Sequence, residues 1–224
     1  MSSGWSLATT SNHPPDPVAI IHHDRDFVVV NKPAGLLSVP GSGPERRDSA
    51  EVRLKRDFPT LRLVHRLDQD TSGLMVFALN YPAQRQLHRF FRERRVTKHY
   101  QALVQGLVAE AEGEIDLPMG PDWPRRPRQQ IDHETGKSAR TFYRVLERNP
   151  RAGPTRVLLI PITGRTHQLR LHLQALGHPI FGCDLYAPPE VFEASPRLLL
   201  HACGLGFPHP GRNEDCWFES RPPF

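Results

Sequence analysis

Cysteine is scarce in this sequence. Its 224 residues include three cysteines, Cys183, Cys203 and Cys216, and no two of them form a C-x-x-C pair. Such a small, scattered set argues against a disulfide-stapled scaffold, and the missing pairs argue against a zinc ribbon. An odd number of thiols, in a chain whose start is unlike an export signal, predicts a reducing, cytoplasmic location.

Long apolar runs are missing too. No stretch approaches the roughly 20 apolar residues that a membrane-spanning helix needs, and the sequence shows no internal repeat or low-complexity tract. Residues 1–17 lack the basic and then apolar segments of a signal peptide, so we expect a flexible polar leader there. The length suits one large domain or two small ones. The missing apolar runs predict no attachment to a membrane.

Positive charge is present in modest excess and is unevenly distributed. The formal net charge is +5, and residues 85–98 hold six Lys or Arg against one acid, Glu93. A second cluster is W-P-R-R-P-R at residues 123–128. Basic clusters beside an aromatic residue favour a polyanionic partner, most often nucleic acid. The alternative, which charge alone leaves open, is a solvated basic face.

The apolar pattern predicts an α+β protein. Strands are expected at residues 27–30, 36–39, 74–79, 98–106, 141–146, 157–160, 198–200 and 216–218, and helices at 48–58, 82–91 and 166–176. The segment 118–127 holds four prolines and should form a long, stiff, basic loop. The order of strands and helices is too irregular for a doubly wound fold, which leaves a mostly antiparallel or mixed sheet.

The most informative stretch is residues 64–78, V-H-R-L-D-Q-D-T-S-G-L-M-V-F-A. Asp68 opens a polar turn between two extended segments, which is a typical place for a functional loop on a rigid scaffold. Taken alone, Asp68 could equally be an ordinary turn residue or a helix cap.

Residues 65–73, H-R-L-D-Q-D-T-S-G, resemble the H-R-L-D-x-x-T-S-G signature of the RluA-type pseudouridine synthase family. Further segments resemble that family in the same order, at residues 30–41, 98–100, 161–172 and 176–184. The resemblance covers residues 18–224. It implies a single catalytic domain without an added S4-type RNA-binding domain, and a mixed sheet with flanking helices and loops around a central catalytic cleft.

The resemblance also implies the chemistry. Pseudouridine formation breaks the N1–C1′ bond of a uridine, turns the base and joins C5 to C1′. Because this isomerisation involves no redox change and no phosphate transfer, we expect no cofactor and no metal. It requires one ionised carboxylate, and Asp68 is the expected one, either as a nucleophile or as a base that removes a sugar proton.

Other residues take their expected roles from the same resemblance. Arg165 is expected to pair with Asp68 and keep it charged. Tyr100 is expected to stack on the target base, with Leu169 packing on its other side. Arg66 is expected to fill the space left by the flipped nucleotide, whose extrusion costs roughly a few kcal/mol. Each role has an alternative. Arg165 could be a structural or surface arginine, and Tyr100 and Leu169 could be core residues. Arg66 could contact a phosphate or form a surface ion pair.

The expected partner is structured RNA, bound by a monomer. The substrate-binding residues are expected to include His65 and, in a family insertion that grips an RNA stem-loop, Trp123, Arg125, Arg126 and Arg128. Residues 89–98 would be a second track for phosphates. Over its length the chain is most similar to dual-specificity members of the family, which modify a large-subunit ribosomal RNA hairpin and tRNA anticodon stem-loops.

Three alternatives remain at this point. The same chemistry could act on one RNA class only, or the scaffold could bind RNA without catalysis. More remotely, Asp68 and Asp70 resemble the paired aspartates of haloacid dehalogenase-type phosphatases, which use magnesium. That motif should follow a buried strand, whereas Arg62, His65 and Arg66 precede it here.

Overall fold

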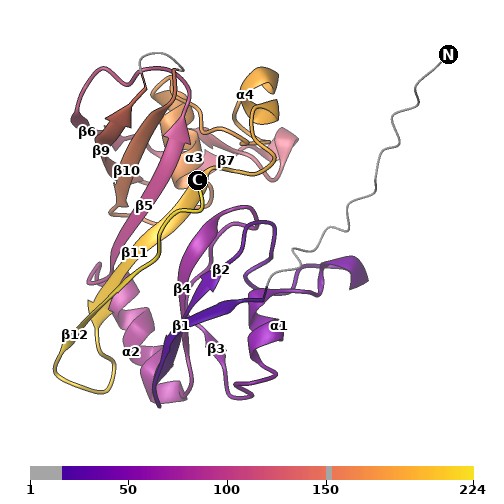
Figure 1. The fold of residues 1–224 in the computed structure, drawn as a ribbon, viewed down its shortest axis with the longest axis vertical. Helices are drawn as coiled ribbons and strands as arrows, with labels where there is room; N and C mark the ends of the chain where they lie inside the picture. The colour runs from indigo at the N-terminus through magenta and orange to yellow at the C-terminus, as the bar shows by residue number, and fades with distance from the viewer. Residues whose placement is uncertain (1–16, 150–152) are drawn as a thin grey trace.

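The computed structural model describes residues 17–149 and 153–224, and a ten-stranded sheet is their main feature (Figure 1). The strand order is β1-β2-β4-β11-β5-β10-β9-β6, with β12 added to β11 and β3 added to β4. Its strands are β1 (Ala19–His23), β2 (Phe27–Lys32), β3 (Arg62–Leu63), β4 (Ser72–Ala78), β5 (Thr97–Val104), β6 (Glu112–Asp116), β9 (Arg140–Arg148), β10 (Thr155–Pro161), β11 (Leu200–Pro208) and β12 (Asp215–Glu219). Of the strand pairs in this sheet, β4 and β11 are parallel and the others antiparallel. The predicted α+β class, with a mixed and mostly antiparallel sheet, is confirmed.

The sheet has two halves, which meet where β4 runs beside β11. The run F-V-V-V of β2 is fully buried, as its β-branched composition predicts, and packs into the half that carries the first two helices. Gly73 allows the close contact between the halves, because a Cβ at this position would lie 2.3 Å from the carbonyl oxygen of Ala202. The glycine of the signature is thus explained by packing.

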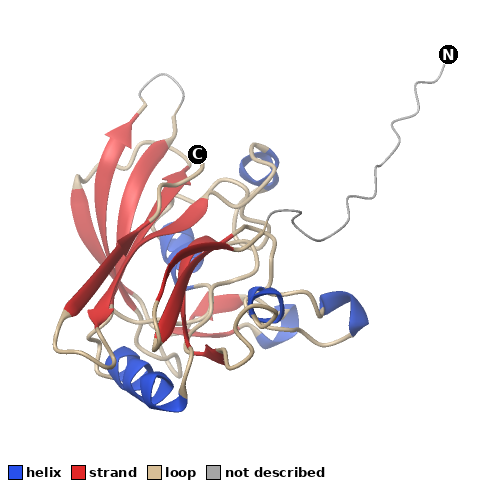
Figure 2. Ribbon diagram, turned by 60° about the horizontal axis from the view of Figure 1, so that its bottom comes forward, coloured by secondary structure: helices blue, strands red, loops and turns tan. Residues whose placement is uncertain are grey.

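Helices flank the sheet, which is strongly bent (Figure 2). They are α1 (Ala50–Leu54), α2 (Tyr81–Arg92), α3 (Gln168–Ala175) and α4 (Pro189–Glu193), with short 3₁₀ turns η1 (Pro44–Arg46) and η2 (Trp123–Arg125). Side chains cap the first two, since Ser49 accepts a hydrogen bond from the amide of Val52, and Asn80 accepts one from the amide of Ala83. None of the helices in these ranges is both long and apolar enough to cross a membrane.

Several element predictions were wrong in detail. Residues 36–39 form no strand but one isolated bridge, between Leu37 and Ser49. The expected loop at 118–127 contains β7 (Met119–Pro121), which pairs with β8 (Gln129–Ile131). The strand expected at 198–200 is the long central β11, whose glycines and terminal proline hid it from the apolar pattern. Charged β6 was missed because it lies at a solvated edge. The expected leader lies, up to residue 16, outside the described residues.

Candidate active site

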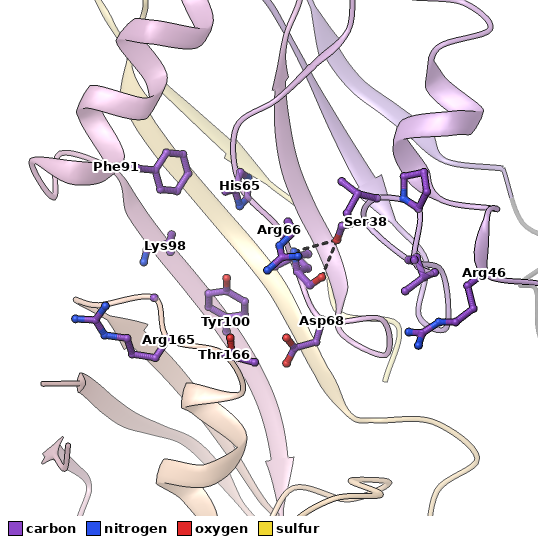
Figure 3. A pocket seen from close by; sticks show the side chains of 16 residues that line it. Ser38, Arg46, His65, Arg66, Asp68, Phe91, Lys98, Tyr100, Arg165 and Thr166 are labelled. Atoms are coloured by element: carbon purple, nitrogen blue, oxygen red, sulfur yellow. Dashed lines mark hydrogen bonds between the residues drawn. The ribbon is translucent and has the colours of Figure 1, made fainter. Parts of the chain in front are cut away.

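The turn that carries Asp68 is fixed by hydrogen bonds to the segment after β2. On one side, Ser38 Oγ donates to the carbonyl oxygen of Leu67 at 2.7 Å and accepts from the amide of Leu67 at 3.1 Å (Figure 3). On the other side, Gln69 Nε2 donates to the carbonyl oxygen of Gly35 at 3.0 Å. Because both neighbours of Asp68 are held in this way, the backbone around Asp68 is in place before any substrate binds.

A buried lysine completes this anchoring. The Lys32 ammonium is fully buried and donates to three carbonyl oxygens, those of Pro33 (2.9 Å), Leu36 (2.7 Å) and Gln69 (2.8 Å). Burial lowers the pKa of Lys32 to about 7, although the charges of Asp70 and Asp68 oppose the shift. Lys32 therefore joins the turn after β2 to the turn that follows Asp68.

The arginine beside Asp68 is Arg170. Its side chain is 3% exposed, and Nη1 lies 4.0 Å from Asp68 Oδ2. Arg170 also forms a close ion pair with Asp184 and donates from Nε to Cys183 Sγ at 3.3 Å. Burial alone would lower the pKa of Arg170, but Cys183, Asp68 and Asp184 raise it above its usual value. A permanently charged guanidinium thus lies beneath the Asp68 carboxylate.

The expected pair between Asp68 and Arg165 is not formed in this structure. Arg165 is exposed, and its Nε donates to the carbonyl oxygen of Ser138 at 3.2 Å (Figure 3). The physical reason is that Arg165 lies in the loop before α3, where its side chain turns to the solvent, whereas Arg170 is on the buried side of the helix. Arg165 still lines the cavity next to Asp68.

The loop before α3 is held by Gln168. Its side-chain oxygen accepts hydrogen bonds from Thr163 Oγ1 at 2.7 Å and from the amide of Arg165 at 3.0 Å. His167 has a left-handed backbone conformation, with φ of 57°, and its Nδ1 lies 2.8 Å from the Tyr186 hydroxyl. These contacts bend the chain into α3 and direct Arg170 toward Asp68.

A cavity of about 530 Å³ opens over Asp68. Tyr100, Lys98 and Arg66 line it, and a smaller adjoining space of about 110 Å³ shares these residues and adds Leu169. The structure therefore brings together Asp68, Tyr100, Arg66 and Leu169, as the sequence predicts. Burial and the charge of Asp68 raise the pKa of Tyr100, so its phenol stays neutral and can present a ring face to a base.

His65 is part of the framework of this cavity. Its Nε2 accepts a hydrogen bond from the amide of Val76 in β4 at 3.1 Å, and its ring stacks on Phe91 with centroids 4.8 Å apart. Burial and the nearby charge of Lys98 lower the pKa of His65 to about 3. A neutral ring that accepts from the backbone continues the pairing of β3 with β4, while the expected RNA contact of His65 stays a prediction.

The basic hairpin β7–β8 is more exposed than the cavity. Trp123 is 66% exposed, and the Arg126 guanidinium stacks 3.7 Å from the centre of its ring. Arg125 Nε pairs with Asp122 Oδ2 at 2.7 Å, and the Arg128 guanidinium lies 5.5 Å from the ring centre of Tyr186. The hairpin residues do not line the cavity over Asp68, and their contacts with RNA stay predictions.

The phosphatase alternative does not fit the fold. Asp68 and Asp70 precede β4 and do not follow a strand of a parallel sheet. In the phosphatase motif D-x-D-x-T, counted from Asp68, the threonine position is residue 72, which is Ser72 in this chain. Burial and then the charge of Asp184 raise the pKa of Asp70. This second carboxyl group thus lies among the charged side chains of Lys32, Asp68, Arg170 and Asp184.

Four residues of the site were not singled out from the sequence: Lys32, Ser38, Lys98 and Arg170. All four lie in segments that resemble the family, which is the signal that could have found them. Only the folded chain shows that the segment 32–38 reaches the Asp68 turn.

The chain is similar to known proteins of one family. Residues 26–175 match the family model described as RNA pseudouridylate synthase. The chain is 54% identical over 220 residues to a protein of Pasteurella multocida named dual-specificity RNA pseudouridine synthase RluA, which covers 97% of this chain and 100% of that protein. It is 50% identical over 210 residues to the protein of the same name from Escherichia coli, with 93% of this chain and 95% of that one covered. Among solved structures, human RNA pseudouridylate synthase domain containing 1 matches with a TM-score of 0.80 and 35% identity, over 95% of this chain and 87% of that one.

Proposed function

The chain belongs to the RNA pseudouridylate synthase family, and we propose that it isomerises uridines in a large-subunit ribosomal RNA hairpin and in tRNA anticodon stem-loops, with Asp68 as its catalytic carboxylate. As a member of that family it is an RNA pseudouridine synthase, an isomerase. One observation carries the residue assignment: Asp68 lies in the cavity beside Tyr100, with the buried Arg170 guanidinium 4.0 Å from its carboxylate.

The neighbours of Asp68 divide the chemistry between them. Arg170 favours the ionised carboxylate, which can attack C1′ or remove a proton from the sugar. Tyr100 and Leu169 hold the extruded base between an aromatic and an aliphatic face, so that the base can turn while it stays bound. Arg66, exposed at the mouth of the cavity, takes the space that the nucleotide leaves in the RNA.

The hairpin β7–β8 supplies the grip on the RNA. Trp123 offers an exposed face for an unpaired base, and Arg126 and Arg128 offer charge to phosphates. The proposal of dual specificity rests on the names of the relatives. The alternative is that the protein modifies a single RNA class, and the experiment below distinguishes the two.

The domain organisation, the oligomeric state and the cellular location are part of the same proposal. We propose that residues 18–224 act as one catalytic domain and as a monomer, because residues from both halves of the sheet line the cavity over Asp68. The free thiols of Cys183, Cys203 and Cys216 fit a reducing cytoplasm. A mass measurement of the purified protein with and without RNA tests the monomer.

The decisive experiment incubates the protein, with a metal chelator, with two short transcripts: a tRNA anticodon stem-loop and the ribosomal hairpin. Pseudouridine is mapped by carbodiimide-dependent stops of reverse transcription. Asp68→Asn should leave both RNAs unmodified, while the matched change Asp57→Asn, at an exposed position, should have no effect.

Each outcome decides one point. Pseudouridine in both RNAs supports dual specificity, and pseudouridine in one keeps the mechanism and narrows the substrate. If neither transcript nor total cellular RNA is modified by the folded protein, the enzymatic proposal is wrong and RNA binding without catalysis takes its place.

A further inference from the structure

From the sequence, Lys98 is expected at the end of a phosphate track, but in the structure it lines the cavity over Asp68. It precedes Tyr100 by two positions in β5, and because side chains alternate along a strand, the two face the same side of the sheet. Both line the cavity of about 530 Å³ and the adjoining smaller space, together with Asp68 (Figure 3). If Tyr100 stacks on the target base, that base occupies a space that Lys98 also lines.

The surroundings of Lys98 leave its charge uncompensated. Its Nζ donates one hydrogen bond, to the carbonyl oxygen of Thr163 at 3.3 Å, and no carboxylate among the described residues forms an ion pair with it. Burial lowers the pKa of Lys98 to about 8. Lys32, by contrast, satisfies three carbonyl oxygens. A partly buried cation without an acidic partner lowers stability, so its presence is best explained by negative charge that the substrate brings.

The reaction produces negative charge at one defined place. When the N1–C1′ bond breaks, its electron pair leaves with the base, and the charge spreads from N1 to the carbonyl oxygens O2 and O4. This holds whether Asp68 attacks C1′ or removes a sugar proton. C5 then bonds to C1′ as the bond between Asp68 and C1′ breaks or the removed sugar proton returns. The proton on C5 leaves and N1 takes up a proton, so the overall change is an isomerisation without any oxidant. A fixed donor at a carbonyl oxygen would stabilise the departing anion.

We propose that the Lys98 ammonium donates a hydrogen bond to a carbonyl oxygen of the uracil and stabilises the base anion that forms when the N1–C1′ bond breaks. The assignment rests on the proposed function. A phosphate is the less suitable partner, because Arg46 and Arg165 line the same cavity and are exposed, so they are more accessible to the RNA backbone.

The test compares Lys98→Met and Lys98→Arg with Lys55→Met, a matched loss of charge on an exposed lysine paired with Glu51. Under single-turnover conditions with saturating RNA, Lys98→Met should slow pseudouridine formation about 100-fold, the effect of removing one donor to a developing anion. Its Kd for RNA should not change. Its Tm should equal or exceed that of the unaltered protein, because a partly buried charge without an acidic partner is removed.

The pH profile separates charge stabilisation from a structural role. For the unaltered protein, kcat/KM should fall as the pH rises through about 8, because the ammonium loses its proton. That fall should vanish in Lys98→Met and move to higher pH in Lys98→Arg. The other titratable groups that line the same spaces are Arg46, His65, Arg66, Asp68, Arg165, His167 and Arg170 besides Tyr100. Burial raises the pKa of Tyr100 and lowers those of both histidines, which moves all three away from 8.

Three results would overturn the proposal. An unchanged single-turnover rate in Lys98→Met excludes a part in bond breaking. A raised Kd with an unchanged rate identifies a phosphate contact instead. A lowered Tm that Lys98→Arg restores, without any shift of the pH profile, identifies a structural lysine. Absence of pseudouridine with the unaltered protein is a different result, since it removes the proposed function together with this inference.

Discussion

The Asp68 turn and the hairpin β7–β8 carry the two halves of the proposed activity, and they are built in opposite ways. The turn is held by Ser38, Lys32 and Arg170, all of them buried, through hydrogen bonds and an ion pair. The hairpin is held at its base, where the amide of Gln129 donates to the Tyr186 hydroxyl, while Trp123 is exposed. Chemistry at one atom needs fixed geometry, whereas binding to a polyanion needs accessible charge.

Loss of the buried Arg170 guanidinium should have the largest effect on stability and rate, because it removes a charge that holds the Asp68 turn. Arg170→Met leaves Asp68 and Asp184, which are 27% and 48% exposed, without their shared cation. We therefore expect a stability loss of about 1.5–3 kcal/mol and a rate too low to detect in the mapping assay. Arg165→Met, at an exposed position five residues earlier, should leave stability unchanged. Urea unfolding and single-turnover rates measure both variants. Equal stability of the two would show that Asp68 does not depend on Arg170.

Lys32→Met should have a smaller effect, which depends on pH. Three carbonyl oxygens lose their donor, of which only that of Leu36 is in a fully buried hydrogen bond. One unsatisfied buried group costs about 1–3 kcal/mol, partly offset by the removal of a buried charge. The folded-state pKa of Lys32 is lowered to about 7 from 10.5, so between these values the unfolded chain binds more protons than the folded one. The stability of the unaltered protein should therefore rise with pH in this window, relative to Lys32→Met, by at most about 1.4 kcal/mol per pH unit. Parallel stability curves from pH 7 to pH 9 would contradict the assigned burial of the ammonium.

The smallest effects are expected within the hairpin, where they sharpen the contrast. Arg126→Ala removes a cation without an acidic partner in the described residues, so its Kd for RNA should rise several-fold, and the slope of log K against log salt should become shallower by about 0.7–0.9. Arg125→Ala should change Kd less, because the charge of Arg125 is already paired with Asp122. Neither should change Tm or the single-turnover rate. Binding titrations at several salt concentrations test this, and a slower rate at saturating RNA would place the hairpin in the chemistry.

The sequence by itself determined the features that depend on local pattern. The apolar run of β2, the amphipathic spacing of α2 and the unbroken signature around Asp68 were each sufficient for a correct prediction. The family, its fold class and its reaction followed from motifs in the right order. The structure places Asp68, Tyr100, Arg66 and Leu169 around adjoining spaces, while their roles in catalysis and binding stay predictions.

Only the tertiary structure decided which groups surround Asp68. Arg165 and Arg170 are both arginines of one motif, and the bend at His167 with the burial of α3 brings the second, not the first, to the carboxylate. The anchoring of Leu67 by Ser38 spans 29 residues, and that of Gln69 by Lys32 spans 37. Such contacts depend on how strands pair and helices pack, and these long-range arrangements leave no local periodicity in the sequence for a pattern to report.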